Sequence, residues 1–376
     1  MTITLSRRNL LAQSGLLLGA ATLSLRAQPA GAQKRSRTAS GIIRLIANEN
    51  PYGPGPSARE ALRAAIDQSW KYTFRQEGQL RELIAEREGV KPRNIMITAG
   101  SAEILRIAGL LYGRPGGEIV AAKPTFDVLP SYARALGCTL QEVALDAEMR
   151  HDLDAMKQRI APSTRLIYIC NPNNPTGTLV NGHKLREFVA SISAQTPVLV
   201  DEAYLDLSDQ WTEHTAVPRV IAADNVIVTR TFSKLHGMAG LRIGYATAPP
   251  KIIKQLERFR MSILNLPGLR AATASYQDLD FQAFSREKIR AGMKITTDLL
   301  DELKLAYTRS WGNFILFDTG GSVREFSAAM RESGIMIGRS YAPYKSWVRV
   351  SMGTVEDMQA FAAAARKYFK QGAKPQ

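Results

Sequence analysis

Short apolar runs alternate with stretches of helical periodicity between about residues 94 and 230. Helical patterns at Ser101–Leu111 and Thr125–Leu136 follow the first two runs. Most of the runs lack the polar–apolar alternation of a half-buried strand, which predicts strands that are buried on both faces. Strands that alternate with helices favour an α/β domain around a mostly parallel sheet. The predicted strands are Asn94–Thr98, Glu118–Ala122, Leu166–Cys170, Val198–Val200 and Val226–Thr229.

The C-terminal part of the chain has a different order of elements. The predicted elements are strand Asn313–Phe317, helix Val323–Ser333, strand Ile335–Ile337, strand Trp347–Ser351 and helix Val355–Phe369. Thr354 and Asp357 have the spacing of a helix cap before the last helix. This order predicts a smaller α+β domain, and Gly268 together with the polar segment Gln277–Asp280 marks its boundary.

Composition and charge narrow the class of protein. The chain has 376 residues, 45% hydrophobic and 22% charged, which predicts a soluble globular protein and excludes a disordered or fibrous one. A formal net charge of +15 can steer anionic substrates, but a solvated basic surface is the more common explanation of such a charge. The Lys and Arg residues are scattered and no nucleic-acid-binding motif is present, so we expect no nucleic-acid partner. Cys138 and Cys170 have no zinc spacing and the four histidines are isolated, so no metal site is expected.

The N-terminus has the features of an export signal. Arg7 and Arg8 precede a moderately apolar stretch that ends near Leu25, and Ala30–Ala32 has the form of an A-x-A cleavage site. The paired arginines in this frame resemble a twin-arginine signal, and the apolar stretch is too short and too weak for a stable membrane anchor. We therefore expect residues 1–32 to direct export of the folded protein to the periplasm; a disordered basic tail is the alternative.

The residues that follow each strand are the candidates for chemistry, because ligands of parallel sheets lie beyond the carboxyl ends of the strands. Thr231, Ser233 and Lys234 follow the last predicted strand, and Arg242 and three glycines come shortly after. A single lysine at a strand end is more often a surface charge. Here the small residues let a planar ligand approach the backbone, and Ser233 and Arg242 offer donors to a phosphate. A desolvated lysine at such a place is nucleophilic, as Schiff-base chemistry requires.

Two other strand ends carry polar side chains. Asp201 and Tyr204 follow Val200, and Asn174 lies in a proline-rich turn after Cys170. A buried carboxylate is costly unless it is paired, and a protonated pyridine nitrogen is a suitable partner that makes its ring an electron sink. Tyr204 and Asn174 offer a hydroxyl and an amide to a ring oxygen. Taken alone, Asp201 is also compatible with a helix N-cap, and the Asn174 segment with an ordinary turn.

The first two predicted strands lead to further parts of such a site. Ser101 and Ala102 open a helix, whose free N–H groups form an anion site. Phe126 follows the second strand, where it is placed to stack on an aromatic ring, although an isolated aromatic residue more often belongs to a core. Together these features match every part of a pyridoxal phosphate site.

At this point the chain resembles a known family, the class I and II aminotransferases of fold type I, and most closely their histidinol-phosphate aminotransferase branch. The resemblance runs from about Arg44 to Met358 and rests on the following segments: Asn48–Pro54, Tyr72, Gly100–Glu103, Asn173–Gly177, Asp201–Tyr204, Ser233–Lys234, Arg242 and Arg349. It implies a large cofactor-binding domain at residues 66–270, a small C-terminal domain at 271–376, and an N-terminal arm at 33–65 that joins the small domain.

The resemblance also implies a role for each residue. Lys234 would hold the cofactor as a Schiff base and move a proton, Asp201 would pair with the pyridine nitrogen, and Phe126 would stack on the ring. The ring oxygen would be held by Tyr204 and Asn174. The phosphate would be bound by Ser101, Ala102, Thr231, Ser233 and Arg242, and by Tyr72 of a neighbouring subunit, which implies a homodimer. The substrate would be bound by Arg349, Asn48, Tyr52 and Arg339.

Strand alternation gives an independent expectation for Arg349. In a strand, its side chain points away from Val348 and Val350, which fits an arginine aimed into a cleft beside an apolar core. An exposed strand arginine is the alternative.

Two departures from the family pattern bear on the substrate. The Tyr-Pro-Asp segment that is common in the family reads Tyr72-Thr73-Phe74 here. Histidinol-phosphate enzymes carry an arginine directly after a Gly-Ile-x-Val strand, whereas this chain has Gly338 there and Arg339 one residue later. A shift of one residue turns a side chain to the other face of a strand. This shift argues against histidinol phosphate as the substrate, and an export signal argues against a role in histidine biosynthesis.

The sequence thus predicts an exported, pyridoxal-phosphate-dependent aminotransferase that moves an amino group from an L-amino acid to a 2-oxo acid. Decarboxylation of an amino acid or of a threonine-phosphate-like substrate, and amino-acid oxidation, are alternatives, because Lys234 and Asp201 serve all three. A non-catalytic binding protein has no use for Lys234, and a transcription regulator lacks its DNA-binding module here. The substrate side chain stays open among aromatic, basic and phosphorylated ones.

Overall fold

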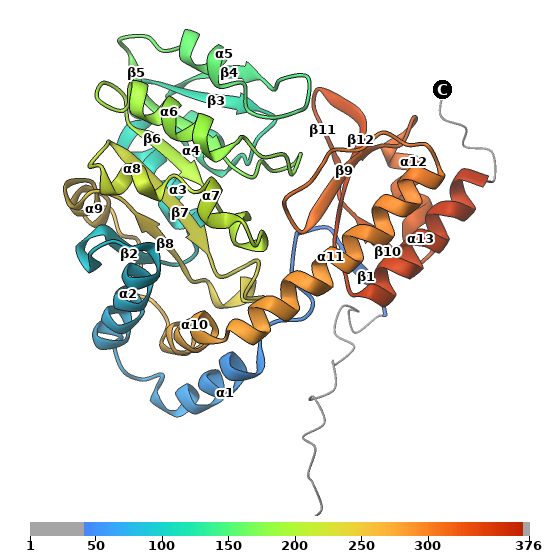
Figure 1. Ribbon diagram of the computed structural model, residues 1–376, viewed down its shortest axis with the longest axis horizontal. Coiled ribbons are helices and arrows are strands. Elements are labelled where there is room, and N and C mark those ends of the chain that lie inside the picture. The colour runs from blue at the N-terminus through green and yellow to red at the C-terminus, as the bar shows by residue number, and fades with distance from the viewer. Residues whose placement is uncertain (1–40, 371–376) are drawn as a thin grey trace, which may run out of the picture. The chain divides into compact units, whose positions relative to one another are not determined.

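A seven-stranded sheet forms the centre of the computed structural model, which describes residues 41–370 (Figure 1). Its strand order is β2-β8-β7-β6-β5-β3-β4. Only β8 runs antiparallel to its neighbours, and the other pairs are parallel. The α/β class and the mostly parallel sheet are therefore confirmed. The strands are β2 (Ile95–Thr98), β3 (Glu118–Lys123), β4 (Thr139–Ala144), β5 (Thr164–Cys170), β6 (Val198–Asp201), β7 (Val226–Thr231) and β8 (Gly244–Thr247).

Helices cover both faces of this sheet, because its inner strands are apolar on both sides. In β5, Tyr168 and Cys170 point toward one layer of helices, and Ile167 and Ile169 point toward the other. The first layer consists of α3 (Ser101–Tyr112), α4 (Val128–Ala135) and α9 (Pro250–Glu257). The second consists of α5 (Leu153–Gln158), α6 (Gly182–Ile192) and α8 (Val217–Ile221), with the short α7 (Trp211–His214) beside α6.

A third group of helices packs against the edge of the sheet that β2 and β8 form. Ile95, Ile97 and Tyr245 share a buried cluster with side chains of these helices. The helices are α1 (Pro56–Ala65), α2 (Phe74–Glu88) and α10 (Leu266–Gln277). In the sequence, α1 and α2 precede the sheet and α10 follows it. Their packing therefore brings together segments from before and after the sheet (Figure 1).

Two small sheets and three helices form the C-terminal part. In Figure 1, α11 (Leu279–Glu302) starts next to α10 and runs to these sheets. One sheet is antiparallel and consists of β9 (Phe314–Asp318), β12 (Tyr344–Ser351) and β11 (Ser340–Tyr341). The other pairs β1 (Ile43–Leu45) with β10 (Ile335–Ile337) in parallel. Their apolar faces pack against α11, α12 (Val323–Glu332) and α13 (Val355–Lys370).

The cap predicted for the last helix is confirmed. The Thr354 backbone N–H donates to Asp357 Oδ2 at 2.9 Å, and the Asp357 N–H donates to Thr354 Oγ1 at 3.2 Å. These reciprocal bonds satisfy N–H groups that the first turn of a helix leaves without partners. They fix the start of α13 next to the end of β12, which carries Arg349.

Two expectations were wrong in detail. The helix predicted from Thr125 begins only at Val128, because Thr125 Oγ1 donates to Asn173 Oδ1 at 2.9 Å and so holds that turn against the next loop. Gly268, expected near the domain boundary, lies inside α10 close to the Leu241 carbonyl oxygen, and the segment Gln277–Asp280 contains the break between α10 and α11. The domain limits stay a prediction, and the signal predicted for residues 1–32 lies outside the described residues.

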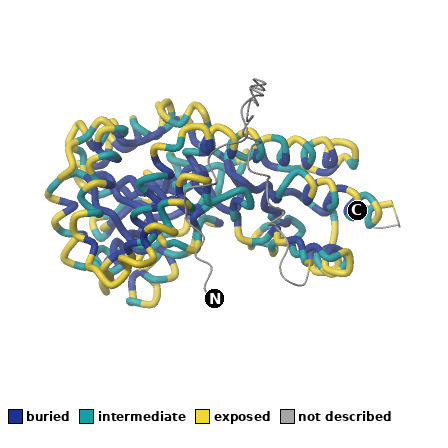
Figure 2. Tube along the Cα trace, turned by 90° about the horizontal axis from the view of Figure 1, so that it is seen from below, coloured by how far each residue is buried: buried dark blue, intermediate teal, exposed yellow. Residues whose placement is uncertain are grey.

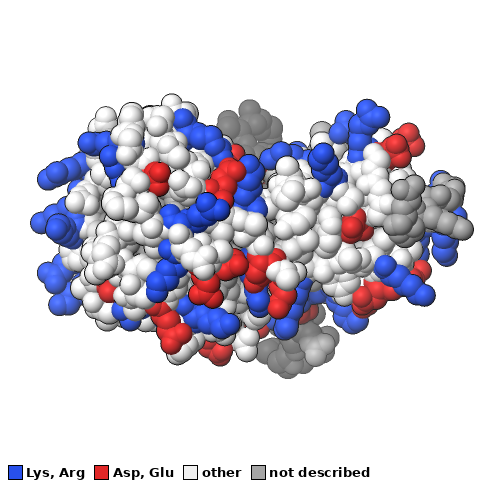
Figure 3. Space-filling model, turned by 90° about the horizontal axis from the view of Figure 1, so that it is seen from above, with Lys and Arg blue, Asp and Glu red and all other residues white. Residues whose placement is uncertain are grey.

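Burial and charge follow the layered arrangement. In Figure 2 the buried segments run through the interior of the trace and the exposed ones lie along its outside. On the face shown in Figure 3, Lys and Arg side chains are scattered among acidic ones. None of the helices within residues 41–370 combines the length and the apolar character needed to cross a bilayer.

Candidate active site

The carboxyl ends of the central strands bring the predicted residues to one edge of the sheet. Cys170, Asp201 and Thr229 lie side by side on β5, β6 and β7, since the register pairs Cys170 with Asp201 and Asp201 with Thr229. Gly244 on β8 pairs with Thr98 on one side and Thr231 on the other. The loops that follow these positions therefore converge, as expected for the ligand side of such a sheet.

Lys234 lies in the loop after β7, half-buried at this edge. Its Nζ donates to the Asn48 carbonyl oxygen at 2.9 Å and lies 5.2 Å from the centre of the Tyr204 ring. Desolvation, and then the nearby Arg349 guanidinium, lower the pKa of Lys234 to about 8. A substantial fraction of this amine is therefore unprotonated, and nucleophilic, in mildly alkaline solution.

Asp201 is the last residue of β6 and is 1% exposed. Its Oδ1 accepts a hydrogen bond from the Ala203 N–H at 3.2 Å, while its Oδ2 has no well-formed hydrogen bond within residues 41–370. Burial raises the pKa of Asp201 to about 7. The alternative of a helix N-cap is wrong, because only the short 3₁₀ turn Leu205–Leu207 follows. A buried carboxylate with a free oxygen calls for a cationic or N–H partner.

Tyr204 and Asn174 meet through their polar ends. Asn174 Nδ2 donates to the Tyr204 hydroxyl oxygen at 3.1 Å, and Asn48 Nδ2 donates to the same oxygen at 3.0 Å. Tyr204 is buried, and burial raises the pKa of its hydroxyl above the usual value. A neutral hydroxyl and an amide thus lie together, as the predicted contact with a ring oxygen requires.

An anion cradle is formed where α3 begins. Ser101 and Ala102 open this helix directly after Gly100, whose φ of +81° favours glycine. A Cβ on Gly100 would overlap the Arg242 guanidinium. Arg242 Nη1 in turn lies 3.4 Å from Ser233 Oγ, which accepts a hydrogen bond from Thr231 Oγ1 at 2.9 Å. Helix N–H groups, two hydroxyls and an arginine therefore converge on a place that suits a phosphate.

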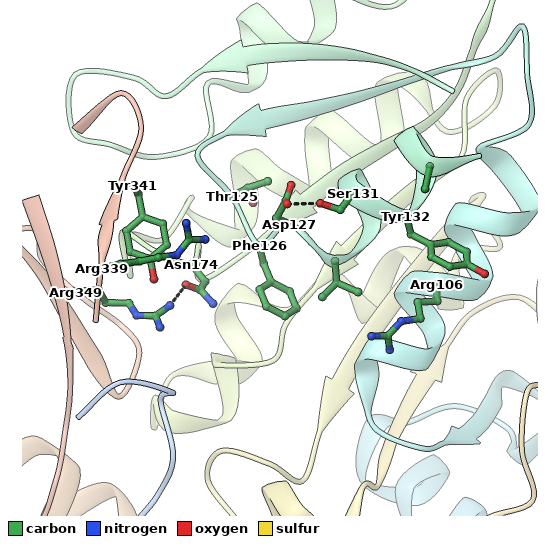
Figure 4. Close-up of a pocket in the computed structure, with 12 residues that line it drawn as sticks. Arg106, Thr125, Phe126, Asp127, Ser131, Tyr132, Asn174, Arg339, Tyr341 and Arg349 are labelled. Carbon is green, nitrogen blue, oxygen red and sulfur yellow. Dashed lines mark hydrogen bonds between the residues drawn. The ribbon is translucent and has the colours of Figure 1, made fainter. Parts of the chain in front are cut away.

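A cleft of about 600 Å³ joins the sheet edge to β12 (Figure 4). Phe126 and Asn174 line it from the large unit, and Arg349 lines it from β12. Arg349 Nη1 donates to Asn174 Oδ1 at 2.6 Å and Nη2 donates to the Ile46 carbonyl oxygen at 2.8 Å. Val348 and Val350 are fully buried on the opposite face of the strand, as alternation predicted. The cleft thus combines an aromatic face, an amide and a guanidinium.

Arg339 lines the same cleft although it comes one residue later than the arginine of the family. Its guanidinium lies 5.0 Å from the centre of the Tyr341 ring, and Figure 4 shows it close to Asn174 and Arg349. A Cβ on Gly338 would overlap the Arg349 carbonyl oxygen, which accepts the Gly338 N–H at 3.0 Å. The close approach of β12 therefore excludes a side chain at 338, and the next residue reaches the cleft.

Three of the predicted residues, Tyr52, Tyr72 and Asn48, do not line the cleft. The Tyr52 hydroxyl accepts a hydrogen bond from the Val355 N–H at 3.0 Å, at the start of α13. Tyr72 is 74% exposed, beside the exposed rings of Trp70 and Phe74. Asn48 is buried, and its side chain is bonded to Tyr204 and Ser351 instead of facing the cleft.

A buried ionic network beneath the site was missed. Arg230 bonds to Glu202 and Glu88 at 2.9 Å and to Asp206 at 3.0 Å, and all but Asp206 are almost fully buried. The signal was present, since Arg230 and Glu202 stand beside apolar strands, but Glu88 lies 142 residues away from Arg230. No group of three or more His, Cys, Asp or Glu side chains suited to a metal ion occurs within residues 41–370.

Comparisons with known proteins identify the family. The profile of aminotransferase class I and II matches residues 40–364. The chain belongs to this family. It is 37% identical over 331 residues to the histidinol-phosphate aminotransferase of Moorella thermoacetica. The alignment covers 87% of this chain and 85% of the relative. It is 35% identical over 339 residues to histidinol-phosphate aminotransferase 1 of Cupriavidus pinatubonensis, with 88% and 89% covered.

A solved relative gives the fold and the cofactor. Histidinol-phosphate aminotransferase from Sinorhizobium meliloti in complex with pyridoxal-5′-phosphate has a TM-score of 0.81 and 27% identity, and the match covers 87% of this chain and 90% of that chain. The chain is therefore an aminotransferase of fold type I that uses pyridoxal phosphate.

The residues of this aminotransferase fit that cofactor. When bound, pyridoxal phosphate supplies a ring that stabilises negative charge on the α-carbon of the substrate. The free Oδ2 of Asp201 suits the ring nitrogen, the cradle of Ser101, Ser233 and Arg242 suits the phosphate, and the amine of Lys234 suits the aldehyde. The buried walls around Asp201 keep water from its carboxylate and so strengthen its interaction with a cation.

Proposed function

We propose that this aminotransferase moves the amino group of an L-amino acid to a 2-oxo acid, with both substrates using the same cleft in turn. The observation that carries the proposal is the pair formed by Lys234 and Asp201, a half-buried amine whose pKa is lowered and a buried carboxylate whose pKa is raised. Opposite shifts at one site are typical of groups prepared for proton transfer and charge pairing.

Each remaining residue has a task in this proposal. Arg349 binds the substrate α-carboxylate through its planar pair of donors, and Asn174 orients the guanidinium. With the cofactor bound, Phe126 would cover one face of its ring and Tyr204 would hold its ring oxygen. Lys234 would move the proton at the substrate α-carbon, because its Nζ is the base of lowered pKa at this edge.

The charges of the cleft favour a substrate with an acidic or phosphorylated side chain. Arg349, Arg339 and Arg106 line it, and Asp127 is the acid among its lining residues. Figure 4 shows Arg106 on the wall formed by α3, opposite Arg339 and Arg349. One arginine serves the α-carboxylate, so the other two remain for a distal anion. Aromatic and basic side chains are the competitors in the test.

The test combines labelling with a substrate screen. Borohydride treatment of the loaded enzyme and peptide mapping should place the cofactor on Lys234, and Lys234→Ala should lose both the visible band and turnover. Acidic, phosphorylated (histidinol phosphate included), aromatic and basic amino donors are then compared by the change in cofactor absorbance. Release of carbon dioxide, or of peroxide and free ammonia without transfer of the amino group to an acceptor 2-oxo acid, would overturn amino transfer. An equal response to basic donors would overturn the substrate class.

We infer further that two copies of the chain form a homodimer in which Tyr72 serves the neighbouring phosphate site. Trp70, Tyr72 and Phe74 are 81%, 74% and 75% exposed, and three large aromatic rings so close in sequence form an apolar patch that is typical of an interface. Light scattering should give twice the mass of one chain.

Mixed dimers test whether Tyr72 crosses the interface. A hybrid of Lys234→Ala and Tyr72→Ala chains has one site with both changes and one site with neither, if Tyr72 acts on its neighbour. Activity above that of either variant alone should then appear when the two variants are denatured and refolded together. If Tyr72 acts within its own chain, every hybrid site lacks one group and mixing restores nothing.

We also propose export by the twin-arginine route, which rests on Arg7 and Arg8 in front of the apolar stretch. Cell fractionation should find a shortened chain in the periplasm, and the Arg7→Lys, Arg8→Lys double variant in the cytoplasm. A full-length wild-type chain confined to the cytoplasm would refute the proposal.

A further inference from the structure

Two buried side chains at the ends of β5 and β6 each have a polar atom without a well-formed hydrogen bond within residues 41–370. They are Tyr168, through its hydroxyl, and Asp201, through Oδ2; Thr229 Oγ1 on β7, next to Asp201, is a third such atom. Tyr168 is fully buried and Asp201 is 1% exposed. Buried polar groups in proteins nearly always have a partner. A donor and an acceptor that are both without one, in the same place, therefore suggest a pair that a small movement joins.

The register of the sheet places these two side chains together. β5 and β6 are parallel neighbours, and Cys170 pairs with Asp201 two positions after the pair of Tyr168 and Leu199. Tyr168, Cys170 and Leu199 share the buried cluster on the α3 side of the sheet. The intervening residues Ile169 and Val200 point to the other face. The Tyr168 side chain thus lies on the same face of the sheet as Asp201, on the neighbouring strand and two residues before the position opposite Asp201.

The electrostatics agree with this placement. The Tyr168 hydroxyl lowers the pKa of Asp201, against the larger effect of burial, because it stabilises the carboxylate. The other groups that act on Asp201 are the Ala203 N–H, Glu202 and Lys234, and those that act on Tyr168 are Cys170, Asp201 and Tyr204. The Cys170 thiol already donates to the Pro172 carbonyl oxygen at 3.4 Å. In this set the Cys170 sulfur and the Asp201 carboxylate are both acceptors for the Tyr168 hydroxyl, and sulfur is the weaker acceptor of the two.

A carboxylate that pairs with the cofactor nitrogen needs such a second donor. The proton between Asp201 and a pyridine nitrogen can stay on either partner, and only the protonated ring is a strong electron sink. Within residues 41–370, the well-formed hydrogen bond to this carboxylate is the one that the Ala203 N–H donates to Oδ1. Each added donor lowers the proton affinity of a carboxylate and so shifts the proton toward the ring.

We propose, on the basis of the function proposed above, that Tyr168 is a positioning residue that donates its hydroxyl hydrogen to Asp201 and thereby keeps the proton on the cofactor nitrogen. The side chain acts through Asp201 and touches neither substrate nor cofactor. A phenylalanine fills the same apolar cluster without burying a hydroxyl. The hydroxyl therefore has a use at this position beyond packing.

The experiment compares Tyr168→Phe with a matched control. Tyr276→Phe also removes a buried hydroxyl that has no well-formed hydrogen bond, but it lies in the cluster around α10 and does not act on Asp201. Both variants are loaded with pyridoxal phosphate that carries nitrogen-15 in its ring. The ring-nitrogen chemical shift then reports the position of the proton, independently of turnover.

In Tyr168→Phe the nitrogen signal should move toward that of a neutral pyridine. The dissociation constant of the cofactor should rise on the order of 10-fold to 100-fold, as for the loss of a hydrogen bond to a charged group. kcat should fall while the KM of the amino donor stays within about twofold. Tyr276→Phe should match the wild type in all three. A Tyr168→Phe enzyme with the wild-type nitrogen shift would overturn the proposal.

A second variant removes the risk that the phenylalanine protein folds poorly. 3-Fluorotyrosine at position 168 has a more acidic hydroxyl and is a stronger donor, so the nitrogen signal should move the opposite way, further toward the protonated ring. A shift in the same direction as Tyr168→Phe, or none, would contradict the proposal. Failure of borohydride to label Lys234 would instead overturn the aminotransferase site itself, so the two failures are distinguishable.

Discussion

The substitution Asp201→Asn measures the free-energy cost of burying this carboxylate in the cofactor-free enzyme. Burial raises the pKa of Asp201 from an ordinary 3.8 to about 7. The folded state thus binds the Asp201 proton more tightly than the unfolded state does. This difference stabilises the fold fully below pH 3.8, and the stabilisation is lost as the pH rises through 7. A difference of about three pKa units corresponds to at most about 4 kcal/mol. The Asn side chain has no charge to desolvate, so Asp201→Asn should not show this loss.

The assay is urea unfolding of cofactor-free wild type and Asp201→Asn across the range from pH 4 to pH 8. The relevant quantity is the difference between the two free energies of unfolding, because Glu88, Glu202 and His151 also have shifted pKa values and titrate in both proteins. This difference should move in favour of the variant by up to about 4 kcal/mol between the two ends. Asp67→Asn, on an exposed turn, is the control and should follow the wild type. A difference in unfolding free energy that does not change with pH would refute the assignment of a buried carboxyl group with a raised pKa.

Three further predictions concern other parts of the molecule. Gly338→Ala should push β12 and Arg349 out of place, because its Cβ overlaps the Arg349 carbonyl oxygen; steady-state kinetics should show a KM about 10-fold higher for the amino donor, with unchanged cofactor binding. Arg230→Met leaves the buried acids without their cation and should cost about 3 to 5 kcal/mol in urea unfolding at pH 8. The cost should shrink at pH 5, because burial raises the pKa values of Glu88 and Glu202 and lets them protonate. Thr354→Ala removes the cap of α13 and should cost about 1 kcal/mol, seen as an earlier urea midpoint with an unchanged slope.

The central site follows from local sequence because it lies at strand ends. Asp201 ends an apolar run, and Asn174 and Lys234 lie in the loops that follow two others; the parallel arrangement of β5, β6 and β7 brings these ends to one edge. The periodicity of each run therefore determines where the chemistry lies, provided that the strands are parallel. The antiparallel β8 between β2 and β7 was not foreseen, but it leaves this edge intact because both of its neighbours still point the same way.

The contacts that were missed are those between distant segments. Arg230 and Glu88 are 142 residues apart, and Tyr52 and Val355 are 303 residues apart. Hydrophobic periodicity reports which face of an element is buried but not which element covers it. The same limit explains Arg339: the count of residues after β10 suggested that its side chain turns away, whereas the approach of β12 to Gly338 determines where the side chain lies.

Asn48 shows how such a distant contact organises the site. Its carbonyl oxygen accepts hydrogen bonds from Lys234 Nζ and Asn313 Nδ2, its side-chain amide donates to the Tyr204 hydroxyl, and its Oδ1 accepts from Ser351 Oγ. Its φ of +53° is left-handed, a conformation that asparagine tolerates better than most residues. Glycine would adopt this φ but would lose both side-chain bonds, and aspartate would lose the donor to Tyr204. One buried residue therefore holds Lys234, Tyr204 and strand β12, which carries Arg349, in place relative to one another.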